Sequence, residues 1–168
     1  NAASIETVSL GAGADIGYMA FYNCSALKEI DLTAAKKIGD YAFSGDVYYV
    51  CVDDSMAYAA VSSDGRYIYT YHAPALETVQ LSTVTEFGEY CFAYCRELTD
   101  VVLNENITKI PAYAFAGCEK LSNMTVTAEK VKYGPYAFTD CEALTEFYVN
   151  AAVLPEGMFY ECKNLTKV

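Results

Sequence analysis

Short stretches in which apolar and polar residues alternate recur along the chain. In one of them Leu121 is followed by apolar Met124 and Val126, with polar residues between them. Alternation of this kind predicts a short β-strand with one buried face. The stretches begin at eight anchor residues, of which the third is a degenerate copy: Ile5, Leu27, Tyr49, Leu76, Leu98, Leu121, Leu144 and Leu165. The anchors lie 21 to 23 residues apart, except for one step of 27 residues between Tyr49 and Leu76.

A second pattern, Phe-x-x-Cys-x-x-Leu, ends at five of these anchors. Its copies are Phe21-Cys24-Leu27, Phe92-Cys95-Leu98, Phe115-Cys118-Leu121, Phe138-Cys141-Leu144 and Phe159-Cys162-Leu165. A fixed period in the low twenties indicates a solenoid, in which each repeat forms one coil and stacks on the next. The recurring Phe, Cys and Leu are therefore expected in the core and not at a catalytic site.

Each coil also has room for one helical turn. An apolar residue lies five positions before each Phe, and a turn of small residues separates the two. Pro111 and Pro135 suit the first turn of a helix, where the missing N–H costs nothing. The segment is too short for a stable isolated helix, so packing would have to hold it. We expect each coil to comprise a strand, a bend, a short extended segment and one helical turn.

The pattern breaks down after Phe43, where Asp46 replaces the Cys of the signature. Further along, Asp64-Gly65 lies between apolar stretches, which is a strong short-range signal for a β-hairpin. The stretch that follows carries tyrosine at alternate positions: Tyr67, Tyr69 and Tyr71. We predict that a hairpin over about residues 53–73 replaces one helical turn and projects from the solenoid. Its tyrosines are explained equally well as a contact site or as packing on their neighbours.

The charge balance argues against two classes of partner. The chain has 22 acidic and 11 basic residues and a formal net charge of -11, and its longest basic run is Lys36-Lys37. Nucleic acids and anionic membrane surfaces are bound by clustered Lys and Arg, so neither is expected as a partner. No apolar run approaches the roughly 18 residues of a membrane-spanning helix. The acidic excess either keeps the surface soluble or forms an acidic binding face.

The seven cysteines allow three interpretations. The five that share one repeat position are expected to form a column of small buried side chains. Disulfides along this column would need a torsion that parallel side chains rarely reach. Zinc sites need paired spacings such as Cys-x-x-Cys, which the sequence lacks. Cys51 and Cys91 lie off the column, and a bridge between these two stays open.

No residue pattern supports catalysis, a cofactor or a metal. His72 is the only histidine and lies in the predicted insertion, where a surface position is expected. The adjacent pair Asp53-Asp54 lacks the alternating spacing of a calcium loop. No nucleophile elbow or phosphate-binding loop is present. We therefore expect a protein that is not an enzyme and needs no cofactor.

The combined pattern resembles the BspA-like subtype of the leucine-rich repeat. One repeat carries the characteristic residues of that subtype at Leu98, Val101, Leu103, Ile107, Ile110, Ala114, Phe115 and Cys118. The resemblance implies an α/β solenoid, a right-handed leucine-rich-repeat superhelix with one short parallel strand and one helical turn per coil of about 22–23 residues. Residues 1–168 would form a single solenoid of about 7–8 coils. Because the chain begins with Asn1 and stops at Val168 within a repeat, we expect a fragment of a longer protein.

In such a solenoid the outward-facing strand residues form one continuous polar surface. This surface and the hairpin are where a partner would be expected to bind. The candidate partner-binding residues are Glu29, Asp31, Asp53, Asp100, Val102, Glu146 and Tyr148 on the strands and Tyr67 and Tyr69 in the hairpin. A surface that is simply solvated is the alternative, since scattered acids do not create affinity by themselves.

BspA-like proteins are typically surface proteins of host-associated microbes, so the resemblance implies an extracellular or cell-surface location. We expect a non-enzymatic module for protein–protein contact or adhesion, with a host extracellular or cell-surface protein as the candidate partner. One alternative is a structural spacer that presents another domain. Another is a carbohydrate-binding surface built from tyrosines. Fold-level resemblance does not by itself establish any of these functions.

Overall fold

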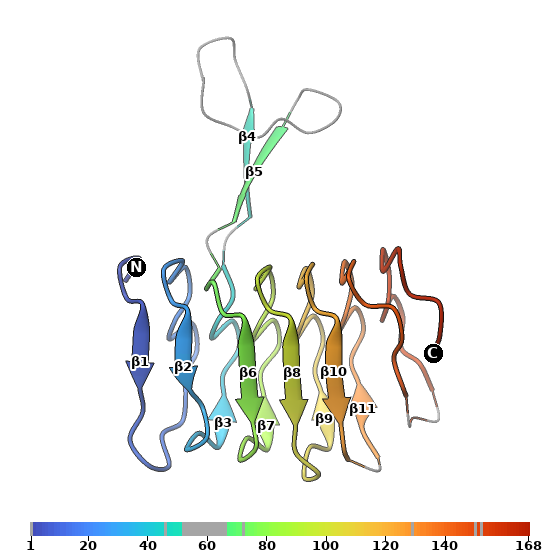
Figure 1. Cartoon of the computed structure of the whole chain (residues 1–168), viewed down its shortest axis with the longest axis horizontal. Helices are drawn as coiled ribbons and strands as arrows, with labels where there is room; N and C mark the ends of the chain where they lie inside the picture. Colours follow the sequence, from blue (N-terminus) through green and yellow to red (C-terminus); the bar gives the residue numbers. More distant parts are fainter. Residues whose placement is uncertain are drawn as a thin grey trace.

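The computed structural model describes residues 2–45, 47–51, 67–71, 73–128, 130–149, 151 and 153–168. This part of the chain winds into a parallel β-solenoid whose coils lie side by side (Figure 1). Its strands are β1 (Thr7–Ser9), β2 (Glu29–Asp31), β3 (Lys37–Ile38), β4 (Val47–Cys51), β5 (Tyr67–Tyr71), β6 (Thr78–Leu81), β7 (Glu86–Phe87), β8 (Asp100–Leu103), β9 (Lys109–Ile110), β10 (Asn123–Val126) and β11 (Lys132–Tyr133). The predicted solenoid is thereby confirmed.

The solenoid strands form two rows. In Figure 1 the front row comprises β1, β2, β6, β8 and β10, and the fainter rear row comprises β3, β7, β9 and β11. In the front row β1 pairs with β2, and β8 lies between β6 and β10. In the rear row β3 pairs with β7, and β9 with β11. These pairs are all parallel, as expected when successive coils contribute equivalent strands to each row.

The front-row strands have one face toward the core and one toward water. Val79, Val101 and Met124 share one register position in β6, β8 and β10. Val79 and Val101 are 2% and 1% exposed, whereas Thr78 and Asn123 at the preceding position are exposed. The structure thus confirms the alternation that predicted these strands.

The phenylalanines of the signature stack through the core. Neighbouring ring centroids lie 5.0 to 5.9 Å apart, with planes within 18° of parallel, in the order Phe21, Phe43, Phe92, Phe115, Phe138 and Phe159. The four central rings are fully buried. Burial of one such side chain contributes about 1.5–3 kcal/mol, so this stack is a main source of stability.

The column cysteines lie beside the phenylalanine stack and hydrogen-bond to it. Four of the five Sγ atoms donate to the carbonyl oxygen of the Phe one coil earlier: Cys95 to Phe43 at 3.2 Å, Cys118 to Phe92 at 3.3 Å, Cys141 to Phe115 at 3.3 Å and Cys162 to Phe138 at 2.9 Å. The fifth, Cys24, donates to the Tyr22 carbonyl at 3.9 Å. The cysteines whose side chains are described, Cys91 among them, are free thiols. The prediction of a column of unbridged thiols is confirmed for these residues, and Cys91 is not in a disulfide.

The helical turn expected in each coil is not found in the described part of the chain. The residue two positions before each Phe has a positive φ: Met19 53°, Tyr41 56°, Tyr90 56°, Tyr113 55°, Tyr136 56° and Gly157 59°. A right-handed helix requires a negative φ at every residue, so a tight turn takes its place. The cause is coil stacking, because turn N–H groups donate to the next coil, as from Phe115 to the Ala137 carbonyl at 2.9 Å.

The residues between Phe43 and Leu76 form an insertion into a single coil. Six positions separate Phe from Leu in each copy of the signature, but 33 separate Phe43 from Leu76, an excess of 27 residues. The solenoid continues across this insertion without a break in its core. Phe43 stacks on Phe92 at 5.0 Å, and β3 pairs directly with β7.

Two strands of the insertion pair with each other and project from the solenoid (Figure 1). β4 and β5 are antiparallel, and Tyr49 is paired with Tyr69. The prediction of a coil anchored at Tyr49 is therefore wrong, because this residue belongs to the projecting pair. The predicted bounds of the hairpin, about 53–73, are also wrong, because its first strand begins at Val47. The predicted turn at Asp64-Gly65 lies outside the described residues.

Gly88 tests how closely neighbouring coils approach each other. A Cβ added at Gly88 would lie 2.2 Å from the backbone N of Asp40, whereas one added at Gly17, the same repeat position in an earlier coil, would meet nothing within 4 Å. We expect Gly88→Ala to lower the free energy of unfolding by about 1–3 kcal/mol, because the coils must separate to accommodate it.

Chemical denaturation followed by circular dichroism measures this effect. Gly17→Ala is the matched control and should leave stability unchanged or raise it by up to about 1 kcal/mol. Equal stability of the two variants would contradict the close contact between these coils.

Candidate binding face of the front-row strands

The outward side of the front-row strands forms one surface, which we call the front face. Its residues are Thr7, Ser9, Glu29, Asp31, Thr78, Gln80, Asp100, Val102, Asn123 and Thr125. Register places Glu29 beside Thr7, and Asp100 between Thr78 and Asn123. Side chains that are 22 or 23 residues apart in sequence are thus brought next to one another.

Six predicted site residues lie on the front face or on its continuation toward the C-terminus: Glu29, Asp31, Asp100, Val102, Glu146 and Tyr148. Val102 is 42% exposed and Tyr148 74% exposed, so both offer apolar surface to a partner. The structure brings Glu146 and Tyr148 together but separates the two acids of β2 from Asp100, because β6 lies between them.

Three further candidates cannot be placed in this way. Asp53 lies outside the described residues. Tyr67 and Tyr69 belong to β5, of which only the backbone pairing with β4 is described.

Asp100 is held by two side chains on the front face. Its carboxylate accepts hydrogen bonds from the Thr99 hydroxyl at 2.5 Å and from the Asn123 amide at 2.9 Å. The bond from Thr99 and then that from Asn123 lower the pKa of Asp100, because they favour the charged form. Asp100 is therefore a fixed negative charge in the middle of the front face.

Asp31 is fixed by the residue that follows β2. The hydroxyl and the backbone N–H of Thr33 donate to its Oδ1, at 2.5 and 2.9 Å. These bonds lower the pKa of Asp31, the hydroxyl bond most. A second ionised carboxylate is thus oriented at the lower end of β2, next to exposed Glu29.

A polar cluster extends the front face toward the C-terminus. Lys167 donates to the hydroxyl of Tyr148 at 2.9 Å and to Glu146 at 3.2 Å. These two contacts, the first most, raise the pKa of the Lys167 ammonium. The Tyr148 ring is held in place while most of it stays in contact with water, which suits a residue that inserts into a partner.

The front row is interrupted between β2 and β6. No hydrogen bond joins these two strands in the described part of the chain, although β1–β2 and β6–β8 are fully paired. In Figure 1 the two strands stand farther apart than their neighbours, below the point where β4 and β5 leave the solenoid. We call this interruption the seam.

A groove of about 360 Å³ extends from β1 across β2 to the first residue of β6. Its lining is mostly polar and comprises Thr7, Val8, Ser9, Lys28, Glu29, Ile30, Asp31 and Thr78. Sequence reasoning identified Glu29 and Asp31 but not the groove, because a perfect repeat would have paired β2 with the next strand. The signal that was available is the insertion itself, which interrupts the coil between these strands.

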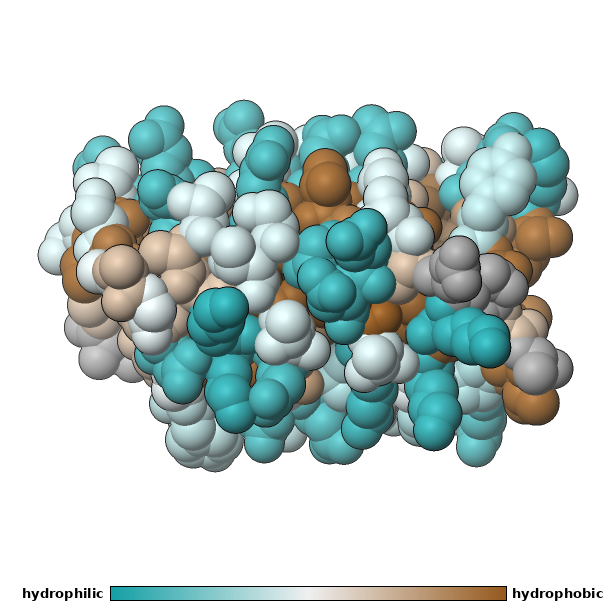
Figure 2. Space-filling view, turned by 90° about the horizontal axis from the view of Figure 1, so that it is seen from below, coloured by the Kyte–Doolittle hydropathy of each residue, from teal (hydrophilic) through white to brown (hydrophobic). Residues whose placement is uncertain are grey.

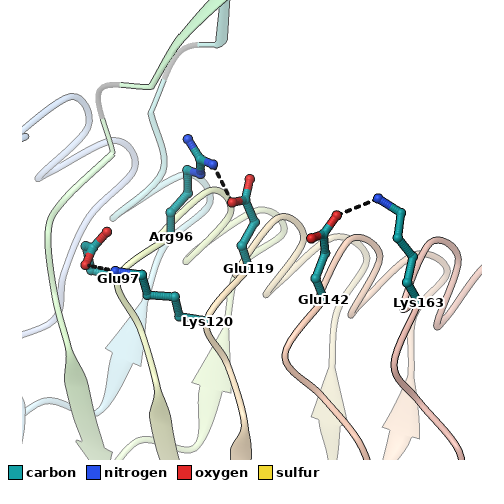
Figure 3. A network of polar contacts seen from close by, with 6 residues as sticks. All are labelled: Arg96, Glu97, Glu119, Lys120, Glu142 and Lys163. Atoms are coloured by element: carbon teal, nitrogen blue, oxygen red, sulfur yellow. Dashed lines mark hydrogen bonds and ion pairs between the residues drawn. The ribbon is translucent and has the colours of Figure 1, made fainter. Parts of the chain in front are cut away.

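A second set of charged side chains lines the bends that lead into the front row (Figure 3). Arg96 pairs with Glu119, Lys120 with Glu97 at 2.5 Å, and Lys163 with Glu142 at 2.6 Å. These residues occupy the two positions after the column cysteines, so opposite charges meet in successive coils. Exposed pairs of this kind contribute about 0–1 kcal/mol each and set the register of the coils more than their stability.

The lower end of the solenoid offers little continuous apolar surface. Figure 2, which views the molecule from below, shows hydrophilic side chains over much of this side. Hydrophobic residues reach the surface in several separate places, including the right-hand end, which is the C-terminal end in Figure 1. Because hydrophilic and hydrophobic residues are intermingled on this side, it offers no continuous apolar patch for a partner. The front face is therefore the better candidate site.

Catalytic and metal chemistry finds no support in the described residues. They contain no group of three or more His, Cys, Asp or Glu that could hold a metal ion. Burial raises the pKa of the Cys118 and Cys141 thiols well above the usual value, so they do not ionise readily. His72 and Asp53-Asp54 lie outside this part of the chain. The described part also contains no helix that could cross a membrane.

Two solved structures resemble this solenoid. A leucine-rich repeat protein of T. pallidum has a TM-score of 0.53 and 16% identity, over 95% of this chain and 56% of its own. A leucine-rich cell surface protein of Faecalibacterium prausnitzii has a TM-score of 0.49 and 18% identity, over 98% of this chain and 51% of its own. The chain thus spans about half the length of these two proteins. No curated protein sequence matches it.

The parallel coils and the first of these structures define a solenoid of the leucine-rich-repeat type. The model of the BspA-type leucine-rich repeat region matches residues 1–50 and 65–168, in six copies. The chain therefore belongs to the BspA-type leucine-rich repeat family. The family model leaves out residues 51–64, which lie within the insertion.

The contact between Asn123 and Asp100 predicts a shift in an acid titration. Asn123→Ala removes one of the two donors to the Asp100 carboxylate, so the pKa of Asp100 should rise toward its usual value of about 3.9. Because the folded-state pKa is lowered, this contact stabilises the fold above the unfolded-state pKa. The contribution is lost as the pH falls through the folded-state pKa.

An NMR titration of the Asp100 side chain measures the shift. Thr125→Ala, in the same strand but without a contact to Asp100, is the control and should leave the pKa unchanged. Equal pKa values of Asp100 in the parent and in the Asn123→Ala variant would contradict the claim that the Asn123 amide lowers the pKa of Asp100.

Proposed function

We propose that this chain is a non-catalytic module that binds a protein partner through the front face. The observation that carries the proposal is the pair of in-register sets of outward side chains, one on β1 and β2 and the other on β6, β8 and β10. A rigid array of this kind presents many contacts at once without ordering flexible loops, which lowers the entropic cost of binding. Membership of the leucine-rich repeat family supports the same role.

The composition of the front face suits a protein partner. Exposed Val102 and Tyr148 supply apolar contact, and tyrosine is enriched among residues that dominate binding energy. Fixed carboxylates at Asp31 and Asp100 supply charge that steers and orients a partner. A partner with basic residues opposite these two acids is favoured.

The carbohydrate alternative has weaker support from the tyrosines of the turns. The rings of Tyr41, Tyr90, Tyr113 and Tyr136 stack on one another with centroids 4.5–5.1 Å apart. Their faces are therefore covered by neighbouring rings, and only edges and hydroxyl groups are left for a sugar.

An extracellular or cell-surface location and a role in adhesion are part of the proposal. They rest on the BspA-type family, whose members are typically surface proteins of host-associated microbes. The candidate partner is accordingly a host extracellular or cell-surface protein.

Binding to purified extracellular-matrix and cell-surface proteins, measured by biolayer interferometry at physiological salt, tests the proposal. Any partner found is measured again with a front-face variant, Asp100→Ala with Tyr148→Ala. We expect at least about tenfold weaker binding, because the variant removes a fixed charge and an exposed aromatic anchor.

The matched control is Glu105→Ala with Tyr160→Ala, which removes one acid and one exposed tyrosine away from the front face. It should change the affinity by less than about twofold. Loss of binding in the control with full binding in the front-face variant contradicts the assignment. Absence of binding to every protein tested favours the structural spacer instead.

A further inference from the structure

In the part of the chain that the structure describes, the facing edges of β2 and β6 have no hydrogen-bond partners at the seam. After four of the anchors the next residue donates its N–H to the coil before, as from Thr99 to the Glu77 carbonyl at 2.8 Å and from Ser122 to the Thr99 carbonyl at 3.1 Å. Beyond β10, among the described residues, Thr145 makes no such bond to Ser122. No equivalent bond runs from Glu77 to Lys28 in the described part of the chain. Unpaired backbone groups along β2 and β6 are a template for another strand.

The two coils that border the seam are joined behind it. β3 pairs with β7, and Phe43 stacks on Phe92, so the rear row and the core are closed. Below the seam the Thr83 hydroxyl lies within hydrogen-bond distance of the Thr33 and Ala35 carbonyls, at 2.9 and 2.7 Å, and donates to one of them at a time. The opening is therefore confined to the front, where β2 and β6 face each other.

The walls of the seam have a defined chemistry. Ile30 is half-buried and lines the groove; at the same register position Val8 and Met124 are also half-buried, and Val79 and Val101 are buried. Outside it, Glu29 and Asp31 place two carboxylates on the front face along β2, and Lys28 adds one ammonium to the same groove, so its lining carries a net negative charge. A segment that fits here has apolar side chains directed inward and basic side chains directed outward at alternate positions.

We propose that the seam binds an extended peptide segment of alternating apolar and basic residues, which adds a strand between β2 and β6. This proposal rests on the proposed function and gives it a mode of recognition: main-chain hydrogen bonds provide affinity, and Ile30, Glu29 and Asp31 provide selectivity. The coils separate at the front to admit the strand and stay joined at β3 and β7. The acidic side chains distinguish a basic segment from an acidic one by charge complementarity.

Hydrogen exchange of the free protein tests the seam before any ligand is added. The Glu77 amide should exchange about tenfold faster than the Thr99 and Ser122 amides, which are hydrogen-bonded in the same repeat position. Equal protection of the three amides would show that β2 and β6 are paired, and would overturn the proposal.

The binding test uses a capped heptapeptide in which lysine alternates with valine, at physiological salt. We expect it to protect the amides of Glu29–Asp31 and Thr78–Leu81 from exchange. The matched probe is the same peptide with two central amides N-methylated, which keeps all charges and side chains but removes two backbone donors. It should bind at least about tenfold more weakly, because strand addition depends on these donors.

Glu29→Gln should weaken peptide binding about two- to fivefold, as expected for an exposed ion pair, and the control Glu105→Gln should not. Equal affinity of the two peptides, or protection of amides outside the seam from hydrogen exchange, overturns strand addition.

Neither result affects the proposed function, which is tested at Asp100 and Tyr148 with whole proteins. Loss of partner binding in that front-face variant, together with no peptide binding, would leave the front face as the site and reject the seam.

Discussion

Stacking of each coil on the coil before it, in register, is the interaction on which the rest of the structure depends. A single coil of this size cannot bury its apolar residues alone, and adjacent coils supply the missing surface. The consequence is that equivalent residues meet: Phe43 on Phe92, and Cys118 on the Phe92 carbonyl. The same register places Asp100 beside Asn123 on the outside. Stacking in register therefore determines both the contacts in the core and the arrangement of side chains on the front face.

The constraint also explains where the chain tolerates an interruption. The 27 additional residues enter a coil between its Phe and its Leu, at the bend that leads into the front row. The rear row and the phenylalanine stack continue past this point, whereas the front row opens between β2 and β6. The projecting pair of β4 and β5 belongs to this insertion, and the seam and its groove lie in the front row beside the coil that the insertion enters. It is the place where this solenoid departs most from a regular repeat.

Features that recur in every coil were predicted well from the sequence, whereas features that occur only once in the chain were predicted poorly. The spacing of Leu121, Met124 and Val126 predicted a strand and its buried face, because equivalent positions recur in every coil. The helical turn was wrong, since propensity does not reveal that turn N–H groups donate to the next coil. Tyr49 was misread as an anchor because alternation alone fits both a solenoid strand and a strand of a projecting pair. The front-face acids were predicted from register, but the seam depends on a missing pairing that no motif marks.

Deletion of residues 46–72 tests the central claim most directly, because it joins Gly45 to Ala73 and restores the six-residue spacing between Phe43 and Leu76. If register between coils determines the fold, the shortened chain should unfold cooperatively, with a free energy of unfolding within about 1 kcal/mol of the parent or above it. Chemical denaturation followed by circular dichroism measures both quantities. A shortened chain that fails to fold, or that loses its cooperative transition, would contradict the account.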